Sequence, residues 1–150
     1  MTEWLQKRGW HIIPSYDYTG AENNKAPRLQ GEKVAFVIPD LDASRSGRRF
    51  WIEVKSKGNA SFTISTQRFE HGISARHWAD YWRVQRETGT VVWLFIVERE
   101  SGSLIGQTLE RLEPMARRYG GSAMGRGGMI FFPRNAFSVL HQFPDALGGQ

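Results

Sequence analysis

The sequence predicts an α/β domain in which a mixed β-sheet is flanked by helices, and three observations support this prediction. Apolar residues recur with the period of a strand in Phe50–Lys55 and with the period of a helix in Ser74–Thr88. The segment Val91–Val97 is almost wholly apolar, which is typical of a central strand covered on both faces. A chain of 150 residues is large enough for one hydrophobic core, so we expect residues 1–150 to form a single domain.

The N-terminal part is expected to contain a short helix, a strand, a polar loop and a second strand, in this order: Thr2–Arg8, Trp10–Tyr16, Asp17–Arg28 and Val34–Ile38. Thr2 is placed to cap the helix, and Gly9 is placed to end it. Pro39 ends the second strand, because proline cannot donate a hydrogen bond to a neighbouring strand.

A β-hairpin is predicted next. Asp42–Arg49 contains serines and a glycine and is interpreted as the turn, and Phe50–Lys55 follows as a strand. Alternation along this strand places Phe50, Ile52 and Val54 on one face and Trp51, Glu53 and Lys55 on the other. Paired with Val34–Ile38, the strand would bring the Pro39 end of its neighbour close to Glu53.

The C-terminal half is predicted to alternate helices and strands: a helix at Ser74–Thr88, a strand at Val91–Val97, a long helix at Leu109–Tyr119, a mobile glycine-rich segment at Gly120–Gly128, an edge strand at Met129–Phe132 and a short helix at Asn135–His141. Trp78 and Tyr81 belong to the apolar stripe of the first of these helices, which Gly89 would end.

Composition narrows the classes of function. The formal net charge is +5, from 20 Lys+Arg against 15 Asp+Glu, and a basic protein attracts polyanions such as nucleic acid. There are no cysteines, which excludes disulfides and a cysteine-ligated zinc site. No apolar stretch is long enough to predict a membrane span or a secretory signal. We therefore expect a cytoplasmic location, or a phage-encoded protein that acts in the host cytoplasm.

The candidate site is carried by Asp40, Glu53 and Lys55. Strand geometry puts Glu53 and Lys55 on one face, about 7 Å apart, and the hairpin can place Asp40 beside Glu53. Buried carboxylates are costly unless they are paired or hold a metal. Two carboxylates with the backbone carbonyl of Val54 make an oxygen site that suits Mg²⁺ or Mn²⁺, whose remaining ligands are waters and phosphate oxygens. Such a metal polarises a phosphate and activates water, and a lysine offsets the developing charge.

These residues resemble the motif of the PD-(D/E)xK nuclease superfamily, which has the restriction-endonuclease-like fold. Pro39-Asp40 matches the PD element and Glu53-Val54-Lys55 matches (D/E)xK, and the predicted order of elements resembles the αβββαβ core of that superfamily over Trp4–Val97. The resemblance implies that Asp40 and Glu53 bind the metal and that Lys55 is the catalytic lysine. It also suggests Glu3 as an additional acid from the first helix and Gln67 as a catalytic glutamine.

A group of basic residues around the motif is expected to contact the DNA backbone: Lys25, Arg28, Arg45, Arg48, Arg49, Lys57, Arg68 and Arg76, with His71 as a phosphate contact or a proton-transfer group. Each has a plainer interpretation. His71 could cap a helix or close a loop, and Arg76 could join a solvated salt-bridge network with Asp80. The tryptophans could stack on bases, but their periodic positions favour the core.

The sequence therefore predicts a Mg²⁺- or Mn²⁺-dependent deoxyribonuclease, structure-selective or weakly sequence-specific. Cutting both strands of a duplex needs two active sites, which a homodimer would supply. One alternative is a non-catalytic nucleic-acid-binding module on the same fold. Another is a basic protein-interaction or structural domain. For Asp40, Glu53 and Lys55 themselves, the alternative to a catalytic site is a cross-strand salt bridge on a solvated sheet face.

Overall fold

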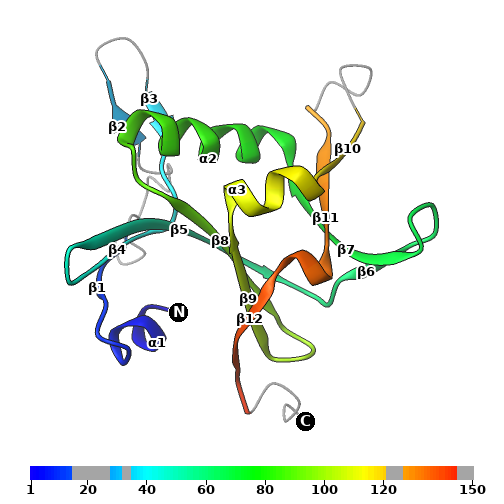
Figure 1. The fold of residues 1–150 in the computed structure, drawn as a ribbon, viewed down its shortest axis with the longest axis horizontal. Coiled ribbons are helices and arrows are strands. Elements are labelled where there is room, and N and C mark those ends of the chain that lie inside the picture. Colours follow the sequence, from blue (N-terminus) through cyan, green and yellow to red (C-terminus); the bar gives the residue numbers. More distant parts are fainter. Residues whose placement is uncertain (15–27, 32–34, 121–126, 145–150) are drawn as a thin grey trace, which may run out of the picture. The chain divides into compact units, whose positions relative to one another are not determined.

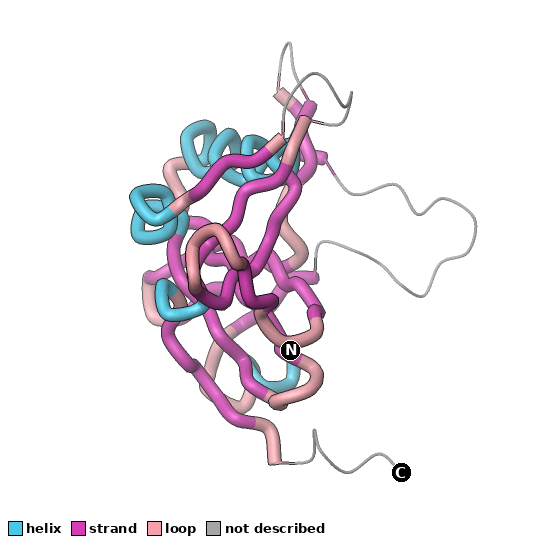
Figure 2. Tube along the Cα trace, turned by 90° about the vertical axis from the view of Figure 1, so that its right-hand side faces the viewer, coloured by secondary structure: helices cyan, strands magenta, loops and turns pink. Residues whose placement is uncertain are grey.

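The computed structural model describes residues 1–14, 28–31, 35–120 and 127–144, and strands are the main secondary structure in this part of the chain (Figure 2). In chain order the elements are α1 Thr2–Gln6, β1 His11–Pro14, β2 Arg28–Gln30, β3 Ala35–Val37, β4 Leu41–Arg45, β5 Arg48–Lys57, β6 Ser61–Thr63, β7 Arg68–Ser74, α2 Ala75–Thr88, β8 Val92–Glu98, β9 Ser103–Thr108, α3 Leu109–Leu112, the 3₁₀ helix η1 Glu113–Met115, β10 Arg117–Tyr119, β11 Met129–Pro133, the 3₁₀ helix η3 Arg134–Ala136 and β12 Ser138–Gln142.

The larger sheet has the strand order β1-β4-β5-β8-β9-β12 (Figure 1). Its pairs β1–β4, β4–β5 and β9–β12 are antiparallel. A second sheet has the order β10-β11-β7-β6, and β2 pairs with β3 alone. The chain divides into two compact units, Met1–Glu53 with Asp80–Trp93 and Val54–Ala79 with Leu94–Gln150.

In the first unit, β4 and β5 form a tight hairpin. The register pairs Leu41 with Ile52 and Arg45 with Arg48. Ser46 and Gly47 form the turn and both have positive φ, 48° and 77°. This is the type I′ geometry that matches the twist of the two strands.

The observed hairpin differs from the predicted one in both its turn and its first strand. The first half of the segment interpreted as a turn belongs to the strand β4, because Leu41 and Ala43 alternate inward as a strand requires. Its last two residues, Arg48 and Arg49, begin β5. The segment predicted as partner of β5 is β3, which pairs with β2 instead. Short polar residues between the inward positions of β4 concealed its strand character.

The two helical segments of this unit pack on its strands. Leu5 of α1 is buried, but Met1 is the N-cap, so the prediction that Thr2 caps the helix is wrong. In the C-terminal part of α2, Tyr81 and Val84 are buried, and Thr88 Oγ1 accepts a 3.3 Å hydrogen bond from the Trp51 indole. This part of α2 therefore covers the face of β5 that carries Trp51.

In the second unit, β11 lies between β10 and β7, so it is not the edge strand that the sequence predicts. Its Phe132 is completely buried and packs on Trp78 of α2, with ring centroids 4.7 Å apart. Trp78 is 2% exposed and therefore belongs to the core. β8 ends in this unit, where it is followed by β9 and then β12 in the sheet.

Two predicted helices of this unit need correction. The long helix expected at Leu109–Tyr119 ends at Leu112, because Pro114 interrupts helical hydrogen bonding and β10 follows. The helix expected at Asn135–His141 is a short 3₁₀ turn followed by the strand β12. The strands β6, β7 and β9 are not predicted from the sequence.

Some predictions fall outside the described residues: those for Lys25, most of the loop Asp17–Arg28, and the central part of Gly120–Gly128 with Arg126. Within the described residues, no helix is long and apolar enough to cross a membrane.

Candidate functional site

The β4–β5 hairpin brings the chain at Asp40 close to the level of Glu53. Asp40 directly precedes β4, whose first residue, Leu41, pairs with Ile52. If the antiparallel register continued by one residue, Asp40 would lie level with Glu53, and side chains at directly opposite positions share a face with Cβ atoms about 4.5–5.5 Å apart. That these two carboxylates share one site stays a prediction; the strand that pairs with β5 is β4, and not the strand expected before Pro39.

Glu53 is a buried carboxylate that is held by a buried tyrosine. Its exposed fraction is 6%, and Tyr81 Oη donates a 2.7 Å hydrogen bond to Glu53 Oε1. Sequence reasoning placed Tyr81 in the apolar stripe of its helix and missed this role. The sequence could have indicated this hydrogen bond, because a buried tyrosine hydroxyl needs a polar partner and Glu53 is the acid of the motif.

Val54 and Lys55 are the next residues of β5, which continues unbroken to Lys57. Lys57 is partly buried, and this burial lowers the pKa of its ammonium, with repulsion from Lys55 as the smaller cause. The strand therefore carries two neighbouring lysines that influence each other electrostatically, next to the acid of the motif.

The candidate metal ligands are few. Among the described residues, no group of three or more histidine, aspartate or glutamate side chains is gathered as a metal site. The predicted donors are two carboxylates and the Val54 carbonyl. This set fits Mg²⁺ or Mn²⁺, which are commonly bound through one or two carboxylates, with the remaining ligands from water and substrate phosphate.

The additional acid and the glutamine predicted for the site, Glu3 and Gln67, both occupy exposed positions. Glu3 lies in the first turn of α1. Gln67 lies in the turn between β6 and β7, where its Nε2 donates a 2.7 Å hydrogen bond to the Ile64 carbonyl and its φ is 53°. The catalytic roles proposed for both residues stay predictions.

The predicted DNA-contact residues differ in how firmly they are held. Arg49 forms two hydrogen bonds to Asp42, of 2.9 and 2.7 Å, and Arg45 donates to the Arg8 carbonyl at 2.6 Å. The remaining described arginines of the group are exposed: Arg28, Arg48, Arg68 and Arg76. Of these four, Arg68 lies 3.4 Å from the buried carboxylate of Glu70. An exposed guanidinium group is able to contact a phosphate.

His71 is buried inside β7, so it neither caps a helix nor closes a loop. Its Nε2 donates a 2.8 Å hydrogen bond to Glu98 Oε1, and Arg134 binds both oxygens of the same carboxylate at 2.8 and 2.9 Å. Burial lowers the pKa of His71. Burial raises the pKa of Glu98, but the hydrogen bonds from Arg134 and His71 outweigh it and hold that pKa below its usual value. A phosphate contact by His71 would require this cluster to open.

The fold defined by these elements is the restriction-endonuclease-like fold predicted from the sequence. Neither a known protein-family model nor a curated protein matches the sequence. Among solved structures, the chain is similar to Hjc, a Holliday junction resolvase from the archaeal hyperthermophile Archaeoglobus fulgidus, with a TM-score of 0.52 and 15% identity over 89% of this chain and 83% of that chain. It is also similar to a nuclease from a fusselovirus, with a TM-score of 0.48 and 10% identity over 97% of this chain and 82% of that chain. The first similarity confirms the predicted fold.

Proposed function

We propose that this protein is a divalent-metal-dependent nuclease that hydrolyses phosphodiester bonds in DNA. The observation that carries the proposal is the β4–β5 register, which pairs Leu41 with Ile52. These are the chain neighbours of Asp40 and of the buried Glu53, and Lys55 lies two residues after Glu53 on the same strand. The fold shared with Hjc, whose name describes a Holliday junction resolvase, supports the same class of activity.

Each residue of the site has a distinct role in this proposal. Asp40, Glu53 and the Val54 carbonyl would hold Mg²⁺ or Mn²⁺, and Tyr81 keeps the Glu53 carboxylate in place. A divalent ion supplies Lewis acidity that polarises the scissile phosphate and makes hydroxide available near neutral pH. Lys55 orients the attacking water and offsets the negative charge that develops on the phosphate oxygens.

Exposed arginines around this hairpin would bind the substrate backbone. Arg48 lies beside the β4–β5 turn and Arg28 begins β2, and both are exposed. Phosphate contacts of this kind position a duplex without reading its sequence. We therefore propose a structure-selective or weakly sequence-specific enzyme, and a homodimer would supply the two sites that cutting both strands requires.

The test is cleavage of supercoiled plasmid, linear duplex, single strands and a four-way junction, each in Mg²⁺, Mn²⁺ or EDTA. The parent protein should cut at least one of these substrates with either metal and none in EDTA. Lys55→Ala should abolish cleavage, whereas Lys7→Ala, which removes an exposed lysine after α1, should leave it unchanged.

The alternative function is a non-catalytic nucleic-acid-binding module on the same fold. Its observable signature is DNA binding that weakens steeply with salt, because phosphate neutralisation releases counterions, in a protein that cuts nothing. Binding without cleavage under every metal condition would replace the nuclease proposal with this one.

A further inference from the structure

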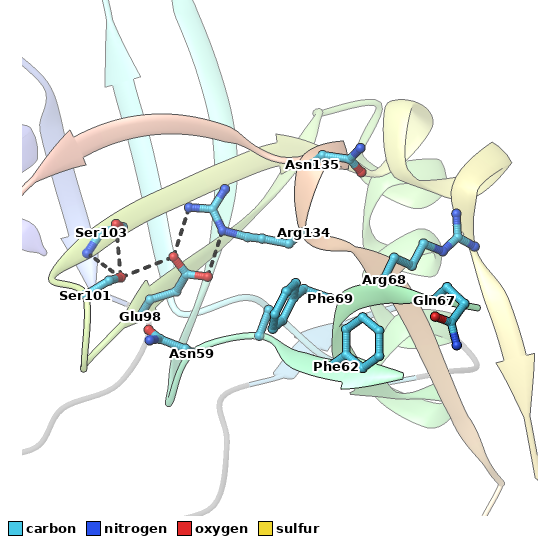
Figure 3. A pocket seen from close by; sticks show the side chains of 11 residues that line it. Asn59, Phe62, Gln67, Arg68, Phe69, Glu98, Ser101, Ser103, Arg134 and Asn135 are labelled. Carbon is cyan, nitrogen blue, oxygen red and sulfur yellow. Dashed lines mark hydrogen bonds and ion pairs between the residues drawn. The ribbon is translucent and has the colours of Figure 1, made fainter. Parts of the chain in front are cut away.

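The second unit contains a cavity of about 640 Å³ that the proposed cleavage chemistry does not use (Figure 3). This volume lies within the range of about 300–1,000 Å³ that is typical of small-molecule sites. It is lined by the β6–β7 hairpin and by residues of β8, β9 and η3.

Two exposed phenylalanines form one wall of the cavity. Phe62 and Phe69 are paired directly across the β6–β7 register, and their ring centroids are 5.3 Å apart in an edge-to-face arrangement. They are 51% and 56% exposed, although aromatic side chains of this size are usually buried. Paired rings in this position offer aromatic surface to an incoming planar group.

The hairpin that carries the rings is held in shape by its own turn. Gln67 Nε2 donates to the Ile64 carbonyl at 2.7 Å, and Thr66 Oγ1 donates to the Thr63 carbonyl at 3.4 Å. Because these bonds order the turn before any ligand arrives, binding at the rings costs less conformational entropy.

The floor of the cavity is polar but carries little net charge. Arg134 binds both oxygens of Glu98, and Ser101 Oγ donates to Glu98 Oε2 at 3.4 Å. The amides of Asn59 and Asn135 also line the space and add hydrogen-bond donors and acceptors (Figure 3). A neutral, flat molecule with its own donors and acceptors suits this floor better than an ion does.

The rim of the cavity has an excess of positive charge. Arg68 lines the cavity and lies 3.4 Å from Glu70, and the same carboxylate accepts a 2.7 Å hydrogen bond from Arg117. Two guanidinium groups share one buried carboxylate, so one positive charge is left to attract an anion. A phosphate attached to the neutral flat molecule would meet that charge.

We propose that this cavity binds one unstacked nucleotide of a nucleic-acid substrate, with the base against Phe62 and Phe69 and the phosphate at Arg68. Base stacking on aromatic rings is tolerant of sequence, because every base presents a π-face. The inference rests on the proposed function in that it takes nucleic acid as the substrate, and it adds that unpaired nucleotides are recognised. It does not depend on which bond is cut.

The test is binding of single-stranded DNA that carries 2-aminopurine, a base whose fluorescence falls when it stacks, measured in EDTA so that no cleavage occurs. The parent protein should quench the fluorescence. Phe69→Leu preserves an apolar side chain but removes the ring, and it should weaken single-strand binding about fivefold or more. The control Tyr119→Leu removes a ring that is 66% exposed and outside the cavity, and it should change nothing.

Several results would overturn the inference. One is a Phe69→Leu protein that binds and quenches like the parent, and another is binding by the parent without any quenching. A third is a parent homodimer that Phe69→Leu dissociates in sedimentation, which would make the rings a contact between copies. If the parent cuts DNA in Mg²⁺ while these results are found, only this inference fails; if it neither binds nor cuts nucleic acid, the proposed function fails with it.

Discussion

The Tyr81–Glu53 hydrogen bond gives the sharpest prediction about the site. Tyr81→Phe removes one hydroxyl from a bond of 2.7 Å between side chains that are 4% and 6% exposed, and it leaves the ring in place. A hydrogen bond to a charged group contributes about 1.5–3 kcal/mol to stability. For a chain of this size each kcal/mol corresponds to about 2–4 °C in Tm, so the midpoint should fall by about 3–12 °C.

The same change should loosen Glu53, the carboxylate that we propose as a metal ligand. Loss of a partner that orients a metal ligand typically reduces metal affinity or activity about 10–100-fold. The assays are thermal unfolding followed by circular dichroism and the Mn²⁺ concentration that gives half-maximal cleavage. Tyr119→Phe is the matched control, because its exposed hydroxyl is solvated. If Tyr81→Phe unfolds at the parent Tm and needs no more Mn²⁺ than the parent, the proposed role of Tyr81 is refuted.

Two further predictions concern the second unit. Because burial lowers the folded-state pKa of His71 below 6.5, its neutral form stabilises the fold. The contribution of His71 to the free energy of unfolding should be complete above about pH 6.5 and decrease below it by up to about 1.4 kcal/mol per pH unit. In urea titrations, His71→Gln should lose this pH dependence, whereas the exposed His11→Gln should keep it. Gly106→Ala places a methyl 2.7 Å from side-chain carbons of the buried Phe95 and the half-buried Leu140 and should cost about 1–3 kcal/mol. Gly58→Ala meets only the flexible end of a glutamate and should cost less in the same titrations.

The elements that could be predicted are those with a strong period or a clear end. The helix Ala75–Thr88 and the strand Val92–Glu98 lie within one residue of the predicted ranges, because an apolar stripe or run defines each and Gly89 ends the helix. β9 and β12 contain serine, glutamine and glycine among their apolar residues, and their strand structure comes from pairing with each other. Such tertiary pairing is invisible to a local pattern.

In the candidate site, too, the local pattern predicts some features, whereas others depend on tertiary pairing. The motif placed Asp40 and Glu53 near each other, since a PD pair before an ExK strand requires a hairpin between them. It could not show which strand supplies the pairing, because β4 is short and its exposed positions are polar. Nor could it show the buried His71–Glu98–Arg134 cluster, whose members come from segments far apart in the sequence.

The central claim is that Asp40 and Glu53 form one metal-dependent catalytic site, and the rate of DNA cleavage by a matched pair of variants tests it most directly. Asp40→Asn and Asp42→Asn make the same isosteric change two residues apart, but Asp42 is committed to its ion pair with Arg49. In saturating Mn²⁺, Asp40→Asn should lose cleavage while Asp42→Asn cuts at the parent rate. Parent-like cleavage by Asp40→Asn would contradict the account.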